Sequence, residues 1–352
     1  MIQMVVTSEI KNGIGWLKIN RPEVLNAINT EVVELLTNAL EKWEKDSNVV
    51  FVCLYGEGQK GFCAGGDMRK FYDLESEDVV AYAEDFFSTE YRLDALIHNY
   101  SKPILAYMNG IVMGGGVGLS VGASHRIVTE KTKWAMPEMN IGFFPDVGAS
   151  FFLNQLPGYV GRYLALTAKV IKANDAIYIG TADYYIKSSE WETIQKKLLT
   201  KDWSAASILK DLSELLTATG TSSLDVSELK VHKEDINHHF QHDTIEEIVA
   251  SLRSKSINGD DWATQELNNI LSKSPTSLKV TLQQLINGKN KSLNECLEME
   301  KDMAIHFMDT DDFYEGVRAV LVDKDGSPKW VPSKLEALTD SDIEQYFFKF
   351  DN

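Results

Sequence analysis

Cysteine is scarce in this chain, with three residues among 352. Cys53, Cys63 and Cys296 are widely spaced and form no Cys-x-x-Cys motif, so the sequence indicates neither a structural disulfide nor a zinc site. We therefore expect a reducing compartment. Cys63 stands inside a glycine-rich motif, where it could be mistaken for a nucleophile, but we expect it to be a small buried apolar residue.

Long apolar runs and positive charge are also lacking. No run is long enough to span a bilayer, and the first residues show neither the apolar core of a secretion signal nor an Arg- and Ser-rich leader. The chain carries 35 Lys and Arg against 52 Asp and Glu, a formal net charge of −17, which disfavours nucleic acids and anionic membranes as partners. We expect a soluble, cytoplasmic protein. An anionic ligand would need a local basic patch, for which the candidates are Arg21, Lys60, Arg69 and Lys70.

The chain does contain two glycine-rich stretches, each placed where an apolar strand gives way to a helix. Residues 61–67 read GFCAGGD, and residues 109–118 read NGIVMGGGVG. Glycine lets the backbone approach a ligand closely, and the N–H groups at a helix start point at whatever lies beyond it. Two such turns aimed at one point would form an oxyanion hole, with Gly66 and Gly115 as its donors. The alternative is that these glycines only serve tight turns.

Two carboxylates, Glu138 and Asp146, follow the second glycine stretch in a largely apolar setting. Near an oxyanion hole they could act as acid, base or nucleophile. For Glu138 the alternative is an exposed loop carboxylate. Asp146 could cap the helix that follows it, but two phenylalanines and a proline precede it, and partial burial would disturb its pKa. The combination indicates an enzyme that acts on an activated carbonyl.

The spacing of apolar residues predicts alternating strands and helices up to Gly148 and helices alone thereafter. Strands are expected at 4–8, 14–20, 49–55, 104–108, 126–129 and 133–136. Helices are expected from Asn29-Thr30, from Asp67 as N-cap, and at 76–99, 114–123, 149–156, 162–168, 173–179, 190–199, 204–216, 245–254, 262–273 and 277–286. This order predicts an α/β fold with a mostly parallel sheet. The histidines of 238–242 are expected in a solvated polar turn rather than at a metal.

These motifs resemble the enoyl-CoA hydratase/isomerase (crotonase) superfamily and, within it, the 3-hydroxyisobutyryl-CoA hydrolase branch. The resemblance rests on the runs FCAGGDMRKFY, NGIVMGGGVGLSVG and WAMPEMNIGFFPDVG, and it resumes near residue 312 with DFYEGVRAVLVDKDGSPKW. It implies a spiral of ββα units, which periodicity alone does not distinguish from a doubly wound sheet. It also implies a core domain over 1–200 with the CoA and oxyanion site, and a mainly helical region over 201–352 that covers the acyl pocket.

The resemblance assigns roles to particular residues. Gly66 and Gly115 would be the oxyanion donors, Glu138 the catalytic glutamate, and Asp146 a second catalytic or substrate-binding group. The positions implied to contact the acyl-CoA substrate are Glu90, Arg21, Leu25, Ala27, Ala64, Gly65 and Gly114. For Glu90 the alternative is a solvated helix position, and for Arg21 a turn fixed by the following proline.

The implied activity is hydrolysis of an acyl-CoA thioester, in the branch that serves valine degradation. Hydratases of the superfamily carry a second glutamate where this chain has Gly118, which counts against hydration of an alkene. No metal or redox cofactor is expected, because CoA is part of the substrate. Two alternatives stay open: an enoyl-CoA isomerase with one carboxylate, and a non-catalytic CoA-binding scaffold. A homo-oligomer also stays open, since the long region 190–290 suggests an assembly unlike the hexamers common in the superfamily.

Overall fold

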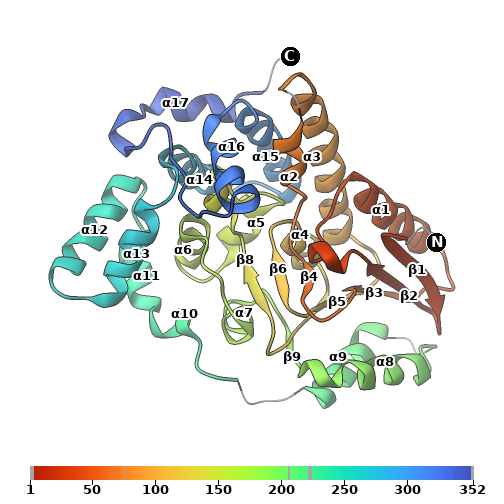
Figure 1. The fold of residues 1–352 in the computed structure, drawn as a ribbon. Coiled ribbons are helices and arrows are strands. Elements are labelled where there is room, and N and C mark those ends of the chain that lie inside the picture. Colours follow the sequence, from red (N-terminus) through yellow and green to blue (C-terminus); the bar gives the residue numbers. More distant parts are fainter. Residues whose placement is uncertain (1–3, 75, 205–206, 221–223, 350–352) are drawn as a thin grey trace. The chain divides into compact units, whose positions relative to one another are not determined.

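The computed structural model describes residues 4–74, 76–204, 207–220 and 224–349 (Figure 1). Its contacts divide the chain into two compact units. Unit 1 comprises Met1–Gly66, Arg92–Trp134 and Ile171–Lys230, and unit 2 comprises Asp67–Tyr91, Ala135–Val170 and Val231–Asn352. Each unit draws on three separate segments of the chain. The expected domains, 1–200 and 201–352, are two continuous stretches of sequence, whereas each of these units combines separate segments. The expected division stays a prediction.

Unit 1 contains a six-stranded sheet in which every neighbouring pair but the first is parallel. The strand order is β1 (Val6–Lys11), β2 (Ile14–Ile19), β3 (Phe51–Gly56), β5 (Ile104–Met108), β7 (His125–Val128) and β9 (Tyr184–Tyr185). Asn12 and Gly13 both take positive φ between β1 and β2, as a two-residue hairpin requires. A second sheet has the order β4 (Gly61–Cys63), β6 (Ile111–Met113) and β8 (Lys133–Ala135). The expected parallel sheet is confirmed.

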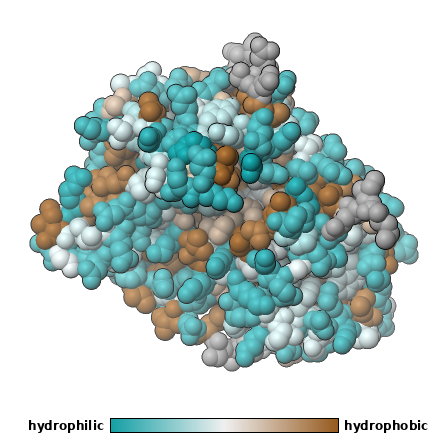
Figure 2. Space-filling view, in the orientation of Figure 1, coloured by the Kyte–Doolittle hydropathy of each residue, from teal (hydrophilic) through white to brown (hydrophobic). Residues whose placement is uncertain are grey.

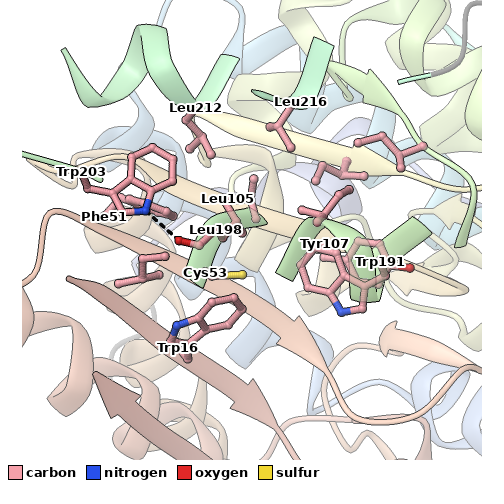
Figure 3. Close-up of a cluster of buried hydrophobic side chains, with 14 residues drawn as sticks. Trp16, Phe51, Cys53, Leu105, Tyr107, Trp191, Leu198, Trp203, Leu212 and Leu216 are labelled. Atoms are coloured by element: carbon pink, nitrogen blue, oxygen red, sulfur yellow. Dashed lines mark hydrogen bonds between the residues drawn. The ribbon is translucent and has the colours of Figure 1, made fainter. Parts of the chain in front are cut away.

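Helices of unit 1 cover apolar strand residues. They are α1 (Thr30–Lys45), α4 (Gly115–Val121), α7 (Ala173–Ile179), α8 (Trp191–Thr200) and α9 (Ile208–Thr219). The side chain of Asn29 caps α1 by accepting from Val32 N, as the sequence predicts. Figure 3 shows side chains of α8 and α9 packed on those of the central strands, where Trp191 stacks on Tyr107 with ring centroids 3.8 Å apart. The helix predicted to begin at residue 204 begins at Ile208 in the structure, as α9. Residues 205 and 206 lie outside the described residues.

Unit 2 is mainly helical. Its helices are α2 (Arg69–Asp73), the part of α3 (Ser76–His98) up to Tyr91, α5 (Ala149–Phe152), α6 (Val160–Thr167), α11 (Lys233–Phe240), α12 (Ile245–Ile257), α13 (Asp261–Leu271), α14 (Pro275–Gly288), α15 (Leu293–Phe307), α16 (Asp311–Val317) and α17 (Asp340–Glu344); α10 (Glu228–Val231) lies at its boundary. Their starts are encoded locally: Ser274 caps α14 with Pro275 behind it, and Ser292 forms a capping box with Glu295 at α15. The expected helical C-terminal region is confirmed.

Two local predictions are wrong. Helix α2 has Met68 rather than Asp67 as its N-cap residue, and Asp67 contributes its backbone carbonyl to Lys70 N. The histidines near residue 240 lie largely in α11 rather than in a polar turn, and His239 is buried with its Nδ1 2.7 Å from Ser251 Oγ. Helical periodicity was hidden there because a polar residue, His239, lies on the buried face beside Ile236 and Phe240.

The visible surface is largely hydrophilic, with apolar residues scattered over it in small groups (Figure 2). Within the described ranges, none of the helices combines the length and the apolar character needed to cross a membrane.

Candidate functional site

The two glycine runs lie against each other in unit 1. Gly65 has φ +98°, and a Cβ there would lie 3.0 Å from Met113 O and 3.3 Å from Gly115 N. Gly114 also has positive φ, and the chain enters α4 at Gly115. Only residues without side chains permit this approach. The glycines therefore serve more than single tight turns, because they bring two backbone segments into contact.

The amides of Gly66 and Gly115 are available as donors by their position. Gly115 is the first residue of α4, and the first N–H groups of a helix have no partner within it. Gly66 forms an isolated bridge with Ile28 in which Ile28 N donates to Gly65 O at 2.9 Å. Neither amide donates in the turn and loop hydrogen bonds of the described residues. This arrangement fits an anion or a polarised carbonyl oxygen.

The turn over residues 21–27 runs beside the first glycine stretch. Ala64 N donates to Leu25 O at 3.1 Å, and Leu25 takes positive φ. Arg21 closes this turn, because its Nη1 donates to Ala27 O at 2.6 Å. The positions expected to contact CoA in unit 1 are thus neighbours, and the contact of Arg21 with CoA stays a prediction.

Glu138 and Asp146 are both buried in unit 2, with exposed fractions of 7% and 5%. Glu138 is the first residue of the 3-10 helix η2 (Glu138–Ile141). Asp146 Oδ2 accepts from the Tyr91 hydroxyl at 2.8 Å. The alternative of an exposed loop carboxylate is wrong for Glu138. The capping alternative is wrong for Asp146, because Gly148 is the N-cap residue of α5 and no side chain of its own turn caps it.

Burial governs the acidity of this carboxyl pair. It raises the pKa of Glu138 well above the ordinary value, and the nearby Asp146 carboxylate raises it further. Burial also raises the pKa of Asp146 to about 7, although the hydrogen bond from Tyr91 opposes that rise. Glu138 Oε2 has no hydrogen-bond partner among the described residues. A buried carboxyl with a raised pKa and an oxygen left for another molecule can take or give a proton.

Glu90 is buried as well, at 1% exposure on α3. A solvated helix position is therefore wrong for it. It precedes Tyr91, and its charge contributes to raising the pKa of that tyrosine. Aromatic rings form the apolar surroundings, with Phe87 stacked on Phe143 at 5.9 Å and Phe143 against Phe144 at 4.5 Å. Such a medium explains why burial raises the pKa values of Glu138 and Asp146.

Lys273 anchors the segment that carries Glu138. Its Nζ donates to Asn140 Oδ1 at 2.6 Å, and burial lowers the pKa of Lys273 to about 8. The turn after η2 closes at Gly142, whose φ is +65° and whose absent Cβ would lie 2.3 Å from Asp312 O. The segment that carries Glu138 is thus fixed by Lys273, just after α13, and by Asp312 in α16.

Sequence reasoning missed a further buried carboxylate, Glu300 on α15. Its oxygens accept from Gly148 N at 2.7 Å and Ser150 N at 2.8 Å, so it caps α5 from a distant part of the chain. Burial raises the pKa of Glu300 to about 7, and the charge of Asp146 adds to that rise. Its sequence signal is that it shares the buried side of α15 with apolar residues, but the helices predicted from the sequence end at residue 286.

The cysteines play no visible part in chemistry. All three are free and buried, and Cys63 Sγ accepts from Gly65 N at 3.4 Å, so its expected role as a small buried residue is confirmed. Across the described part of the chain, His, Cys, Asp and Glu nowhere form a group of three or more able to hold a metal ion. The expectation of no metal and no cofactor stays a prediction.

Comparison with known proteins gives concordant results. A family model described as enoyl-CoA hydratase/isomerase matches residues 14–347. The mitochondrial 3-hydroxyisobutyryl-CoA hydrolase of Gallus gallus is 40% identical over 339 residues, 96% of this chain and 87% of the relative. The small ribosomal subunit protein mS47 of Neurospora crassa is 37% identical, over 95% of this chain and 69% of the relative.

A solved structure shares the fold. The crystal structure of a carnitinyl-CoA dehydratase from Mycobacterium thermoresistibile superposes with a TM-score of 0.91 at 34% identity, covering 99% of this chain and 98% of the other. The expected crotonase-like fold class is confirmed. The expectation of a cytoplasmic protein is wrong, because the hydrolase relative is a mitochondrial protein. Composition and the first residues carried no information that could have revealed this.

Proposed function

This chain belongs to the enoyl-CoA hydratase/isomerase family, and we propose that it hydrolyses 3-hydroxyisobutyryl-CoA to 3-hydroxyisobutyrate and CoA in mitochondria. The observation that carries the proposal is the buried pair Glu138 and Asp146, with raised pKa values and a tyrosine hydroxyl on one of them. The identity to a 3-hydroxyisobutyryl-CoA hydrolase over nearly the whole chain supports the choice of substrate.

For unit 1 we propose the electrostatic part of the chemistry. The N–H groups of Gly66 and Gly115 would stabilise the oxygen of the thioester carbonyl as it gains negative charge. One such donor is typically worth about 3–4 kcal/mol in the transition state. The turn that includes Leu25 and Ala27, together with Ala64, Gly65 and Gly114, would hold the CoA portion.

For unit 2 we propose the reacting carboxylate. In one route Glu138 attacks the thioester carbon, a C–O bond forms, the C–S bond breaks, and the CoA thiolate leaves and takes a proton; water then cleaves the mixed anhydride. In the other route Glu138 takes a proton from a water that attacks the same carbon, the C–S bond breaks, and the CoA thiolate leaves and takes that proton. Asp146 and Glu90 would bind the 3-hydroxyl group and relay protons. Both routes need ionised Glu138, so activity should rise with pH through its raised pKa.

Two observations keep the alternatives in view. The dehydratase structure shows that this fold also carries alkene chemistry, but Gly118 is buried in α4 and offers no second glutamate for it. The Neurospora crassa relative is a ribosomal protein, which is the kind of role a non-catalytic member would have. Both alternatives predict no release of free CoA.

The decisive experiment measures free CoA with a thiol-reactive dye. The substrates are 3-hydroxyisobutyryl-CoA, 3-hydroxypropionyl-CoA, acetyl-CoA and crotonyl-CoA, and the variant is Glu138→Gln. We expect fast release from the two 3-hydroxyacyl substrates and a loss of at least ~10²–10⁴-fold in the variant. Glu34→Gln, at an exposed position of α1, is the matched control and should retain full activity. No release from any substrate would end the proposal, and crotonyl-CoA hydration would indicate a hydratase.

A further inference from the structure

Glu300 holds the chain on the C-terminal side of Asp146. One carboxylate oxygen accepts from Gly148 N at 2.7 Å, and the other accepts from both Ser150 N at 2.8 Å and Ser150 Oγ at 2.6 Å. A side chain from α15 therefore fixes Gly148, the N-cap residue of α5, and Ser150 in the first turn of that helix. Because Asp146 lies only two residues before Gly148, this contact limits where the Asp146 carboxylate can be.

Gln284 holds the chain on the N-terminal side of the same aspartate. Its Nε2 donates to Pro145 O at 2.6 Å and lies 3.3 Å from Glu300 Oε1. Gln284 and Glu300 are both fully buried. The Asp146 loop is thus pinned at both ends by two side chains that also contact each other. A loop built only for packing would not need a buried charge at this place, since burying an ion is costly.

The donors around Glu300 are all neutral: two backbone amides, a hydroxyl and a side-chain amide. The ionisable groups that face it are acidic. Asp146 interacts with it electrostatically, as do Glu138 and Tyr91, and Cys296 lies one turn away on α15. Its negative charge therefore opposes ionisation of the carboxyl pair.

We propose that Glu300 is a positioning residue for the hydrolysis: it fixes the loop that carries Asp146 and, as a buried negative charge, sets the pH range in which Glu138 and Asp146 can act. The inference rests on the proposed function. It differs from a structural role in one measurable respect, because a residue that only packs would not move the pH dependence of the reaction.

The test compares three variants. Glu300→Gln keeps the size and one acceptor oxygen but removes the charge. Gln284→Met releases the other end of the loop without changing charge. Glu298→Gln, exposed on the same helix, is the matched control. For each, kcat and KM are measured against pH, and the protonated buried carboxyl groups of the ligand-free protein are titrated by infrared spectroscopy.

We expect Glu300→Gln to move the acid limb of kcat to lower pH by about one unit, because loss of a negative charge eases ionisation nearby. Gln284→Met should lower kcat about 10-fold with KM and the limb unchanged, because the loop is less well placed. Glu298→Gln should match the wild type. If the acid limb of kcat in Glu300→Gln stays at the wild-type pH, the proposal is overturned. A wild-type kcat in Gln284→Met also overturns it, and this second variant provides the test if Glu300→Gln does not fold.

The infrared titration separates this inference from the proposed function. If the wild type hydrolyses none of the thioesters, the proposed function fails. A downward shift of the buried carboxyl titration in Glu300→Gln then still supports the electrostatic coupling. An unchanged titration overturns the inference whether or not the enzyme is active.

Discussion

Replacing Tyr91 by phenylalanine removes one hydroxyl from the buried carboxyl cluster and changes little else. That hydroxyl donates to Asp146 Oδ2 at 2.8 Å, and both residues are buried. The hydrogen bond stabilises the ionised form of Asp146 and thus opposes the rise of its pKa to about 7. Without it, we expect the pKa of Asp146 to rise further.

The size of the effect follows from the kind of bond. A hydrogen bond to a charged group contributes about 1.5–3 kcal/mol, and one pKa unit corresponds to about 1.4 kcal/mol, so the pKa of Asp146 should rise by about 1–2 units. The pKa of Asp146 in the folded state already exceeds the unfolded value of about 3.9. Over the interval between them the folded state binds more protons, so stability falls as pH rises. In the variant this fall should extend to about pH 8–9.

Two assays measure these shifts. The pH profile of kcat/KM for 3-hydroxyisobutyryl-CoA should show its acid limb moved upward in Tyr91→Phe. Urea unfolding at several pH values should show stability still falling above neutral pH. Tyr163→Phe is the matched control, because the Tyr163 hydroxyl donates to the buried carboxylate of Glu266 at 2.9 Å in the same unit. It should cost similar stability and leave the acid limb in place.

Specific results would refute this reasoning. The expected shift assumes that the reaction needs ionised Asp146 as well as ionised Glu138. An acid limb that stays in place or moves downward in Tyr91→Phe would mean that Asp146 need not ionise, or that the hydroxyl does not stabilise its charge. An equal upward shift in Tyr163→Phe would mean that the pH profile reports folding stability rather than the site.

Two further predictions concern the other parts of the site. Glu138→Gln should be more stable than the wild type above neutral pH. The pKa of Glu138 is raised in the folded state, so ionisation of this buried group lowers the stability of the wild type as pH rises. Thermal unfolding across pH tests this, and a variant less stable than the wild type at alkaline pH would contradict it. Gly65→Ala should lower the free energy of unfolding by about 1–3 kcal/mol and should also lower kcat, because the new methyl group would clash with the second glycine run. Gly180→Ala, at φ +79° with open space around it, should lower stability but not kcat. Urea unfolding beside the CoA-release assay measures both, and equal kcat losses in the two variants would contradict the assigned role of Gly65.

Features encoded within a few residues could be predicted from the sequence. Asn12-Gly13 specifies a hairpin turn because both residues tolerate positive φ, and Asn29 specifies a helix start because its side chain reaches an amide three residues on. The two glycine-rich turns were also visible, because glycine tolerates the positive φ that Gly65 and Gly114 take. Each of these features depends on the chemistry of residues that are neighbours in the sequence.

Features created by distant contacts could not be predicted in this way. Asp146 has the sequence context of a helix cap, but Glu300 performs that function and leaves Asp146 to pair with Tyr91. Helix α3, which carries Tyr91, and helix α15, which carries Glu300, look like ordinary amphipathic helices. Burial of Glu138 was equally hidden, because the anchors of its segment, Lys273 among them, lie far along the chain. The resemblance to a family supplied the roles, and periodicity did not.

The separation of Glu300 from the loop it caps has a consequence for biosynthesis. The bonds from Gly148 and Ser150 to Glu300 span 152 and 150 residues. At typical elongation rates the ribosome needs on the order of ten seconds to add that length. During this interval the nascent chain already contains Glu138 and Asp146 but not the side chain that orders their loop. The enzyme should therefore remain inactive until α15 has been made and has docked, so incomplete translation products should contain Glu138 and Asp146 without the activity.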